Sequence, residues 1–273
     1  MSVERIYNTG ETELELRNKY NYDGSDLRKA QVRMKEMLSF LDKICKENEI
    51  TYFIAFGTLL GAVRHGGFIP WDNDLDVYIY GKDLKKLRRI VNQNNYPYVI
   101  QDYTSDKGFV RYYNVLRDLK SEYIKDEYQH NQRKYRGIQI DLFPYEYGVI
   151  DLGSRLVGKT FGLNERFFLG KNKFLTSVIF HITREGLIPL LKGVSKIKGG
   201  KKVALSYETG VPGHCYYSAD IFPLKTIVFE GLTVPCPNHP EVVLSIDYGT
   251  NYMDLPDEKE RQNHKVVHIE FYD

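Results

Sequence analysis

Three aspartates at alternate positions, Asp72, Asp74 and Asp76, have the spacing most suggestive of chemistry in this chain. They lead into an apolar run, 75–80, that predicts a β-strand. Residues two apart in an extended segment point to the same side, so Asp74 and Asp76 are expected to project together. Two neighbouring carboxylates repel each other unless a cation lies between them, and their oxygens suit Mg²⁺ or Mn²⁺. We therefore expect Asp74 and Asp76 to be catalytic metal ligands.

A second feature, Gly57-Thr58, lies upstream, between the apolar runs 50–56 and 59–64. The first run predicts a buried strand and the second a short helix, with Thr58 placed to cap it. Backbone N–H groups at the start of a helix form a ready anion site. A metal on one side and amides on the other would together hold a polyphosphate.

Other interpretations of the aspartates compete with this one. A solvated acidic loop is equally compatible with the composition. A calcium-binding loop needs Gly at its sixth position and Glu at its twelfth, but counting from Asp72 these positions hold Val77 and Asp83. The D-x-D motif of a sugar transferase has no need of a Gly-Thr helix start upstream. The combination of both features favours a nucleotidyltransferase-type active site.

A third carboxylate, Asp141, lies within the apolar run 138–143, which predicts another strand. Because a buried charge needs a cation or hydrogen-bond donors, Asp141 is expected to have a partner. A predicted strand at 109–116 carries Arg111, with Arg117 directly after it. Such cations could neutralise a leaving phosphate, although pairing with surface carboxylates explains them equally well.

The elements that must position these residues follow from periodicity. Residues 25–48 predict an amphipathic helix that covers a sheet, with one apolar face formed by Met34, Met37, Leu38, Leu41, Ile44 and Cys45. Further predicted elements are a helix at 83–94, strands at 98–103 and 221–230, and a helix beginning near Pro240. Residues 1–24 show little pattern and predict a strap or a loose arm.

Residues 152–202 differ from the rest of the chain in charge. They contain eleven Lys and Arg against two Glu, a net charge of +9 in a chain whose total is +2. Apolar residues at helical spacing accompany these charges. The segment predicts a helical insertion that either lies on an anionic membrane surface or forms a lobe with a solvated basic face. Nucleic-acid binding is less favoured, because no known binding motif accompanies the charge.

Bulk properties narrow the class of protein. At 273 residues the chain predicts a single domain, 1–273, and its small net charge gives no field that argues for nucleic acid. Three cysteines at unrelated spacings predict neither a zinc site nor a disulfide framework, which suits a reducing cytoplasm. No signal peptide and no spanning helix are expected.

The segment GTLLGAVRHGGFIPWDNDLDV at 57–77 resembles the signature of the LicD family of choline-phosphate transferases, whose distant relatives include fukutin-related ribitol-phosphate transferases. GIQIDLFPYE at 137–146 and the stretch 221–256 are similar to the same family in order and spacing. One departure is Asn73, where the family often carries Asp. Asn73 should point away from Asp74 and Asp76, so little depends on it.

The resemblance implies an α+β fold, with a nucleotidyltransferase-type mixed sheet flanked by helices. It also implies an enzyme that transfers phosphocholine from CDP-choline to a hydroxyl of a cell-surface glycan or its lipid-linked precursor. In that reaction Asp74, Asp76 and Asp141 would be catalytic and bind the metal, with Asp141 also placed to take the acceptor proton. The residues implied to contact nucleotide or phosphate are Gly57, Thr58, Arg64, His65 and Arg111.

Alternatives remain open at this point. The transferred unit could be ribitol phosphate, glycerol phosphate or a nucleotide, or the chain could be a non-catalytic module that binds a glycan or a nucleotide. We expect a cytoplasmic protein, peripheral on the inner membrane face if the basic segment binds anionic lipid. No nucleic-acid partner is expected.

Overall fold

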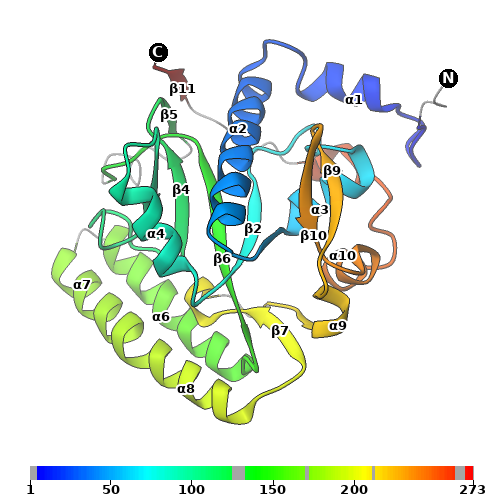
Figure 1. Cartoon of the computed structure of the whole chain (residues 1–273). Helices are drawn as coiled ribbons and strands as arrows, with labels where there is room; N and C mark the ends of the chain where they lie inside the picture. The colour runs from blue at the N-terminus through cyan, green and yellow to red at the C-terminus, as the bar shows by residue number, and fades with distance from the viewer. Residues whose placement is uncertain (1–4, 125–132, 170–171, 211–212, 262–267, 273) are drawn as a thin grey trace.

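The computed structural model describes residues 5–272, apart from 125–132, 170–171, 211–212 and 262–267 (Figure 1). Lys171, one of the cations counted in the basic segment, lies outside the described residues.

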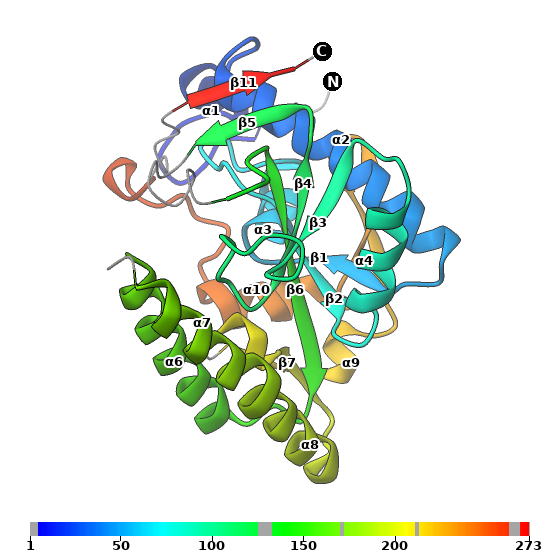
Figure 2. The same ribbon diagram turned by 90° about the vertical axis from the view of Figure 1, so that its left-hand side faces the viewer.

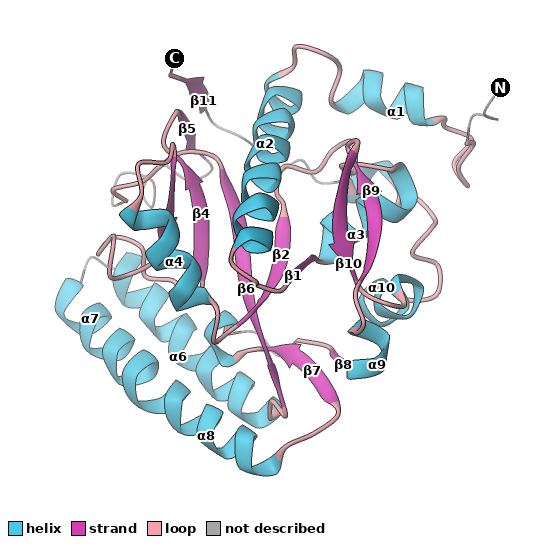
Figure 3. Cartoon of the chain, in the orientation of Figure 1, coloured by secondary structure: helices cyan, strands magenta, loops and turns pink. Residues whose placement is uncertain are grey.

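A mixed β-sheet forms the centre of the molecule, with its strands in the order β1-β2-β6-β4-β3 (Figures 1 and 3). In this row only β2 and β6 are parallel to each other. The bounds are β1 Tyr52–Ile54, β2 Asp76–Tyr80, β3 Tyr98–Gln101, β4 Asn114–Asp118 and β6 Gln139–Tyr147. The end of β6 also pairs with β7 (Lys202–Leu205), which pairs with β8 (Cys215–Tyr217). The mixed sheet flanked by helices expected from the sequence is confirmed.

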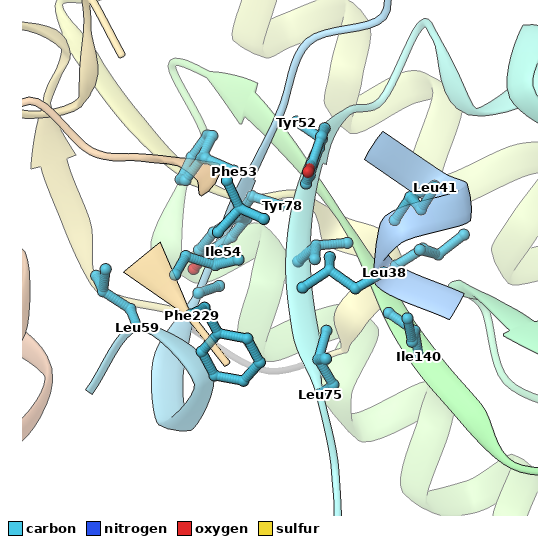
Figure 4. Packing of buried hydrophobic residues seen from close by; sticks show 14 of the residues in the cluster. Leu38, Leu41, Tyr52, Phe53, Ile54, Leu59, Leu75, Tyr78, Ile140 and Phe229 are labelled. Carbon is cyan, nitrogen blue, oxygen red and sulfur yellow. The ribbon is translucent and has the colours of Figure 1, made fainter. Parts of the chain in front are cut away.

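Helix α2 (Asp26–Glu47) covers one face of the sheet, and all six residues predicted for its apolar face are buried. Its N-cap Ser25 accepts a hydrogen bond from the N–H of Arg28. Figure 4 shows Leu38 of α2 near Ile140 of β6. Adjacent residues of a strand point to opposite faces, so Ile140 beneath α2 leaves Asp141 on the other face. The apolar pattern of α2 therefore decides which face carries the carboxylates. Helix α4 (Leu84–Gln93) follows β2 and buries Leu84, Leu87 and Val91.

A β-hairpin, β9 (Lys225–Phe229) and β10 (Leu232–Cys236), packs with α3 (Phe56–His65), and Figure 4 shows Phe229 in the cluster that includes Leu59. Helices α9 (Ser218–Ile221) and α10 (Pro240–Tyr248) flank the hairpin. Glu230, in the hairpin turn, makes an ion pair with Arg28 at 2.8 Å and accepts from the N–H of Phe68. A Cβ on Gly67 would collide with the Glu230 side chain, so a larger residue there would displace that side chain from its contacts.

The described residues of the segment 151–198 form three helical segments that we call the helical lobe (Figure 2). They are α6 (Asp151–Leu169), α7 (Lys173–His181) and α8 (Ile188–Lys198), with a π-helical turn at Ile182–Leu187 joining the last two. The lobe packs on the body through a small cluster of buried residues: Tyr103, Tyr112, Val157, Phe180, Ile188 and Tyr207. The predicted helical insertion is confirmed up to Lys198, but its end was placed too late, because Lys202 already belongs to the sheet.

One described helical run, Lys173–Lys198, is long and apolar enough by length and composition to cross a membrane. Its most apolar 18-residue window has a mean hydropathy of 1.3, and 22% of that window is buried in the protein. No spanning helix is expected from the sequence, because no stretch of 18 uncharged apolar residues exists. This run is a candidate by length and composition alone, so that expectation stays a prediction.

The remaining described elements lie near the two ends of the chain. Helix α1 (Glu13–Tyr20) begins with a capping box, in which Thr12 and Glu15 bond to each other's backbone N–H groups. Strand β5 (Ser121–Ile124) pairs with β11 (His268–Phe271), and short 3₁₀ turns occupy Tyr207–Thr209 and Glu258–Glu260. The N-terminal region predicted to be a strap thus contains a capped helix.

Three predicted boundaries differ from the structure. The strand predicted at 109–116 begins only at Asn114, so Arg111 precedes β4 instead of lying on it. The strand predicted at 221–230 begins at Lys225, because helix α9 and a cis Phe222–Pro223 bond occupy its first residues. Phe56, predicted as the end of a strand, is the first residue of α3.

Candidate active site

The aspartates of the 72–76 segment lie on one side of an extended chain, as their spacing predicted. Asn73 and Leu75 are buried, whereas Asp72, Asp74 and Asp76 are all partly exposed. Asn73 is only 3% exposed, which confirms that it points away from the carboxylates. The alternation places three carboxylates at and just before the start of β2, while their buried neighbours anchor the segment.

The parallel pairing of β2 with β6 brings a fourth carboxylate, Asp141, beside these three. Asp76 and Asp141 are direct partners in the register, and the N–H of Asp141 donates to the carbonyl of Leu75 at 2.9 Å. Side chains at paired positions project to the same face of a sheet. Two segments 65 residues apart in sequence, around Asp76 and Asp141, therefore build one acidic centre.

Helix α3 begins beside this centre, but its start differs from the prediction. Its N-cap is Ala55, and no side chain caps it, so the predicted capping role of Thr58 is wrong. The hydroxyl of Thr58 instead accepts from the N–H of Asp76 at 2.8 Å, which ties the helix to the first residue of β2. The first-turn N–H groups of a helix have no intrahelical partner. Those of Gly57 and Thr58 thus belong to a turn fixed against the acidic strand.

Gly57 is the residue at which this turn comes close to the Asp72 carboxylate. A Cβ on Gly57 would lie 2.8 Å from Oδ2 of Asp72, closer than real Cβ contacts. Glycine at this position is therefore required by the carboxylate, and not by an unusual backbone angle.

We expect Gly57→Ala to reduce activity by displacing Asp72 and the turn. Alanine in a helix normally stabilises it by about 0.5–1 kcal/mol relative to glycine. Gly162→Ala, in α6, is the matched control, because nothing lies within 4 Å of the added methyl group. Thermal melts and turnover should show a gain in stability for Gly162→Ala and a loss of turnover, without that gain, for Gly57→Ala. Full turnover in Gly57→Ala would contradict a functional role for this turn.

Cationic and phenolic groups surround Asp141. Arg111 donates a hydrogen bond to the hydroxyl of Tyr113. Burial alone would lower the pKa of Arg111, but Tyr113 and Asp141 outweigh it and raise that pKa. Burial, followed by the charge of nearby Arg111, lowers the pKa of Arg133 to about 10. Both guanidinium groups remain charged at neutral pH, so the acidic centre has cations along one side.

Two further tyrosines face the aspartates of the 72–76 segment. Burial raises the pKa of Tyr123, and the negative charges of Asp74 and Asp72 raise it further. Tyr248, the last residue of α10, has its pKa raised by burial, by Asp247, and by all three aspartates of the segment. Both hydroxyls stay protonated at neutral pH. The hydroxyl of Tyr123 donates to the carbonyl of Asn73 at 3.3 Å, which fixes it beside the 72–76 segment.

The donor set fits a divalent cation held by part of the acidic centre. Carboxylate oxygens are the ligands that Mg²⁺ and Mn²⁺ prefer. Among the described residues, no three of Asp72, Asp74, Asp76 and Asp141 bring oxygens within 4.8 Å of one another. The three carboxylates predicted to bind the metal, Asp74, Asp76 and Asp141, are thus not drawn together as a three-ligand set, and a site that uses all three stays a prediction.

Arg64 and His65 occupy a different environment, which we call the clasp. Arg64 is 4% exposed and donates to the carbonyls of Tyr252 and Asp254 at 3.0 and 2.9 Å. Its Nε also donates to Nε2 of His65 at 3.0 Å, and Nδ1 of His65 lies 2.7 Å from the Glu13 carboxylate of α1. These partners join α3 to both terminal regions of the chain. Phosphate binding by Arg64 or His65 stays a prediction that these contacts do not favour.

Comparison with known proteins identifies the segment that contains this site. Residues 49–162 match the family profile described as the LicD/FKTN/FKRP nucleotidyltransferase domain. The chain carries a LicD family domain. The match includes α3, β2 and β6, and so contains every aspartate of the acidic centre.

Individual relatives match parts of the chain. The lipopolysaccharide cholinephosphotransferase LicD of Haemophilus influenzae is 40% identical over 60 residues, 22% of this chain and 23% of that protein. The ribitol 5-phosphate transferase FKRP of Mus musculus is 25% identical over 112 residues, 41% of this chain and 20% of that protein. Mannosyltransferase regulator 4 of Saccharomyces cerevisiae is 34% identical over 70 residues, 26% of this chain and 6% of that protein. The chain spans about a quarter or less of the length of these relatives.

Several groups around the LicD domain's acidic centre could not be assigned from sequence. Arg133 lies outside every predicted strand, and Tyr113 lies in the predicted strand 109–116 but just before β4, yet both are close enough to Asp141 to interact with its charge. Tyr248 comes from α10, beyond the segment that matches the family profile. Its place directly before the helix-ending Gly249 was visible, but nothing in that position signals a site.

The clasp predicts how the stability of the LicD domain depends on pH. His65 accepts a hydrogen bond at Nε2, so its neutral form is favoured, and burial lowers its pKa below 6.5. The unfolded chain therefore binds a proton that the folded chain resists, and the free energy of unfolding falls as the pH drops below about 6.5. We expect urea unfolding at several pH values to show this decline, and His65→Gln to be less stable at pH 7 with a shallower decline. Parallel profiles for both proteins would contradict the assignment.

Proposed function

We propose that this protein is a metal-dependent phosphotransferase. It would move phosphocholine, or a similar phospho-alcohol, from a CDP-activated donor to a hydroxyl of a cell-surface glycan or its lipid-linked precursor. The observation that carries the proposal is the in-register pair Asp76 and Asp141, beside the first turn of α3 and inside the LicD domain. A LicD relative named as a cholinephosphotransferase supports the choice of phosphocholine.

The chain's own residues can position the donor. Asp74 and Asp76 would hold Mg²⁺ or Mn²⁺, and the bound ion would neutralise charge on the donor's diphosphate. The N–H groups of Gly57 and Thr58 would bind phosphate oxygens at the start of α3. Arg111, kept charged beside Asp141, would stabilise the negative charge that develops on the leaving phosphate.

Asp141 would receive the proton of the acceptor hydroxyl. The acceptor oxygen forms a bond to the phosphorus next to the choline, and the bond from that phosphorus to CMP breaks, so CMP leaves with the electron pair. No covalent intermediate with the protein is needed, and catalysis consists of positioning and electrostatic stabilisation. Asp141 suits the role because it lies beside the carboxylate of Asp76 while cations face it from Arg111 and Arg133.

A second candidate within the same reaction class is transfer of ribitol phosphate or glycerol phosphate, favoured by the similarity to a ribitol 5-phosphate transferase. A non-catalytic module is the candidate from another class, and one relative is named as a regulator. The full set of carboxylates argues for an enzyme, since a binding module has no need of an acidic centre with a facing proton acceptor.

A donor screen tests these candidates directly. The protein is incubated with CDP-choline, CDP-ribitol or CDP-glycerol and Mg²⁺, and release of CMP is measured with a glycan acceptor present or absent. We expect acceptor-dependent release of CMP from CDP-choline and from neither of the other two donors. Release from another donor would change the assigned alcohol. Binding of a donor by calorimetry without release of CMP under any condition would support the module instead.

A further inference from the structure

The helical run from Lys173 to Lys198 has two unlike sides. Its inward side is buried and consists of Thr176, Phe180, Thr183, Ile188 and Ser195. Its outward side exposes a row of apolar residues that we call the apolar stripe: Phe174, Ile182, Leu190, Val194 and Ile197. Their exposed fractions run from 43% for Val194 to 89% for Ile197. Single exposed apolar residues are ordinary, but a row along one helix marks an interaction surface.

Polar contacts on the inward side fix this helix to the folded body. Arg184 donates to the carbonyl of Tyr112 at 3.1 Å, and Lys192 pairs with Glu146 at 3.0 Å and with Glu208 at 2.5 Å. The hydroxyls of Ser195 and Tyr207 lie 2.6 Å apart. A helix that crossed a bilayer would lose these partners and carry unpaired charges into hydrocarbon. The geometry therefore suits a helix that lies along a surface.

Unpaired cations border the apolar stripe at its C-terminal end. Lys196, Lys198, Lys201 and Lys202 are exposed, and among the residues described by the structure no carboxylate forms an ion pair with any of them. The surrounding segment, 152–202, has a net charge of +9. One of its two glutamates, Glu185, already pairs with His181 at 2.8 Å.

A basic groove lies on α4, outside the helical lobe. It has a volume of about 680 Å³ and is lined by five cations of α4 and the turn before it, with no carboxylate: Lys82, Lys85, Lys86, Arg88 and Arg89. A neighbouring cavity of about 530 Å³ shares Lys85 and Arg88 with this groove and is also lined by Pro189 of α8. This cavity is also lined by Ile188 and Lys192 of the inward side of the helix, so the groove is a basic surface separate from the apolar stripe.

We propose that the apolar stripe and its bordering cations form a docking surface for a bilayer that contains anionic phospholipid. The helix would lie in the plane of the interface, with the stripe among the acyl chains and the lysines at the headgroups. A second copy of the chain fits less well, because two segments of like charge would meet. Nucleic acid would pair with the cations but leave the stripe in water. The proposal does not depend on the transfer reaction.

Sedimentation with vesicles tests the docking surface. We expect the protein to bind vesicles that contain phosphatidylglycerol, to ignore pure phosphatidylcholine vesicles, and to lose most binding at high salt. Replacing Lys196, Lys198, Lys201 and Lys202 by Gln should weaken binding by about 10²–10³-fold, from roughly a fivefold loss or slightly less for each lysine. Replacing Ile182, Leu190 and Ile197 by Ser should also weaken binding, with the cations intact.

A matched control removes the same charge elsewhere. Lys29, Lys43 and Lys46 of α2 are well exposed, and with the exposed Lys259 they make a second quadruple Gln variant that should keep vesicle binding. Circular dichroism and release of CMP from a soluble donor and acceptor show that each variant is folded, separately from vesicle binding. Loss of CMP release with intact vesicle binding would count against the transfer reaction alone.

Four results would overturn the proposal. They are failure to bind phosphatidylglycerol vesicles at low salt, equal effects of the two quadruple variants, and resistance of the bound protein to alkaline carbonate, which indicates a spanning helix. The fourth is a dimer that the Ser variants dissociate while vesicle binding is unchanged, which would assign the stripe to a second copy of the chain.

Discussion

Asp76→Asn is expected to abolish transfer while leaving the fold intact. Asp76 is the register partner of Asp141 and the first residue of β2, so it lies at the centre of the acidic cluster. The amide keeps the size of the side chain but removes the charge that would hold a divalent cation. Loss of one of two carboxylate ligands should cost about 10³-fold in turnover or more, roughly 4 kcal/mol of transition-state stabilisation. Asp74→Asn should behave in the same way.

The measurement is release of CMP at saturating Mg²⁺, with thermal melts to confirm folding. Asp26→Asn serves as the control, because Asp26 lies on α2, is well exposed and pairs only with Lys29 among its described ion pairs. It removes the same charge at a distance from the site and should keep full turnover. Near-wild-type turnover in Asp74→Asn or Asp76→Asn would contradict the proposal that these carboxylates bind the divalent cation.

Asp141→Asn should bind the donor nearly normally and fail in transfer. The residue faces Arg111 and Arg133, and an amide there can no longer accept the proton of an attacking hydroxyl. A loss of about 10²–10⁴-fold in turnover is the usual effect of removing a general base. Calorimetry with CDP-choline and Mg²⁺ gives donor affinity, and CMP release gives turnover.

The two measurements separate two roles for Asp141. If donor affinity and turnover fall equally, the carboxylate is a metal ligand, because it contributes before the chemical step. If turnover alone falls, it acts on the acceptor. A variant with unchanged affinity and unchanged turnover would remove Asp141 from the site.

Local patterns predicted the parts of this fold that depend on neighbouring residues. The alternation of Asp72, Asp74 and Asp76 with buried neighbours followed from strand geometry, and the six apolar residues of α2 followed from helical periodicity. Asp141 was recognisable because a charge within an apolar strand needs a partner. Each of these signals is contained in fewer than about ten residues or in one repeated spacing.

Long-range contacts decided what local patterns could not. Thr58 follows a strand and precedes an apolar run, which is the usual setting of an N-cap, yet its hydroxyl bonds to Asp76 and the helix begins three residues before it was expected. Arg64 and His65 lie within the family-like segment but bond to α1 and to residues 252–254. In such cases the role of a side chain depends on which distant segment lies beside it in the folded protein. Spacing along the chain does not predict that contact.

The clasp also bears on the order in which the chain can complete its fold during synthesis. Arg64 donates to the carbonyls of Tyr252 and Asp254, which lie 188 and 190 residues further along the chain. During synthesis, the segment with all four aspartates of the acidic centre leaves the ribosome long before those two carbonyls have been made. Until then the Arg64 guanidinium lacks both of these acceptors. A nascent chain that ends before residue 250 would hold the aspartates, the first turn of α3 and Arg111, yet that helix would keep an exposed, hydrated cation at its end. The end of α3 thus gains these two partners only after most of the protein has been made.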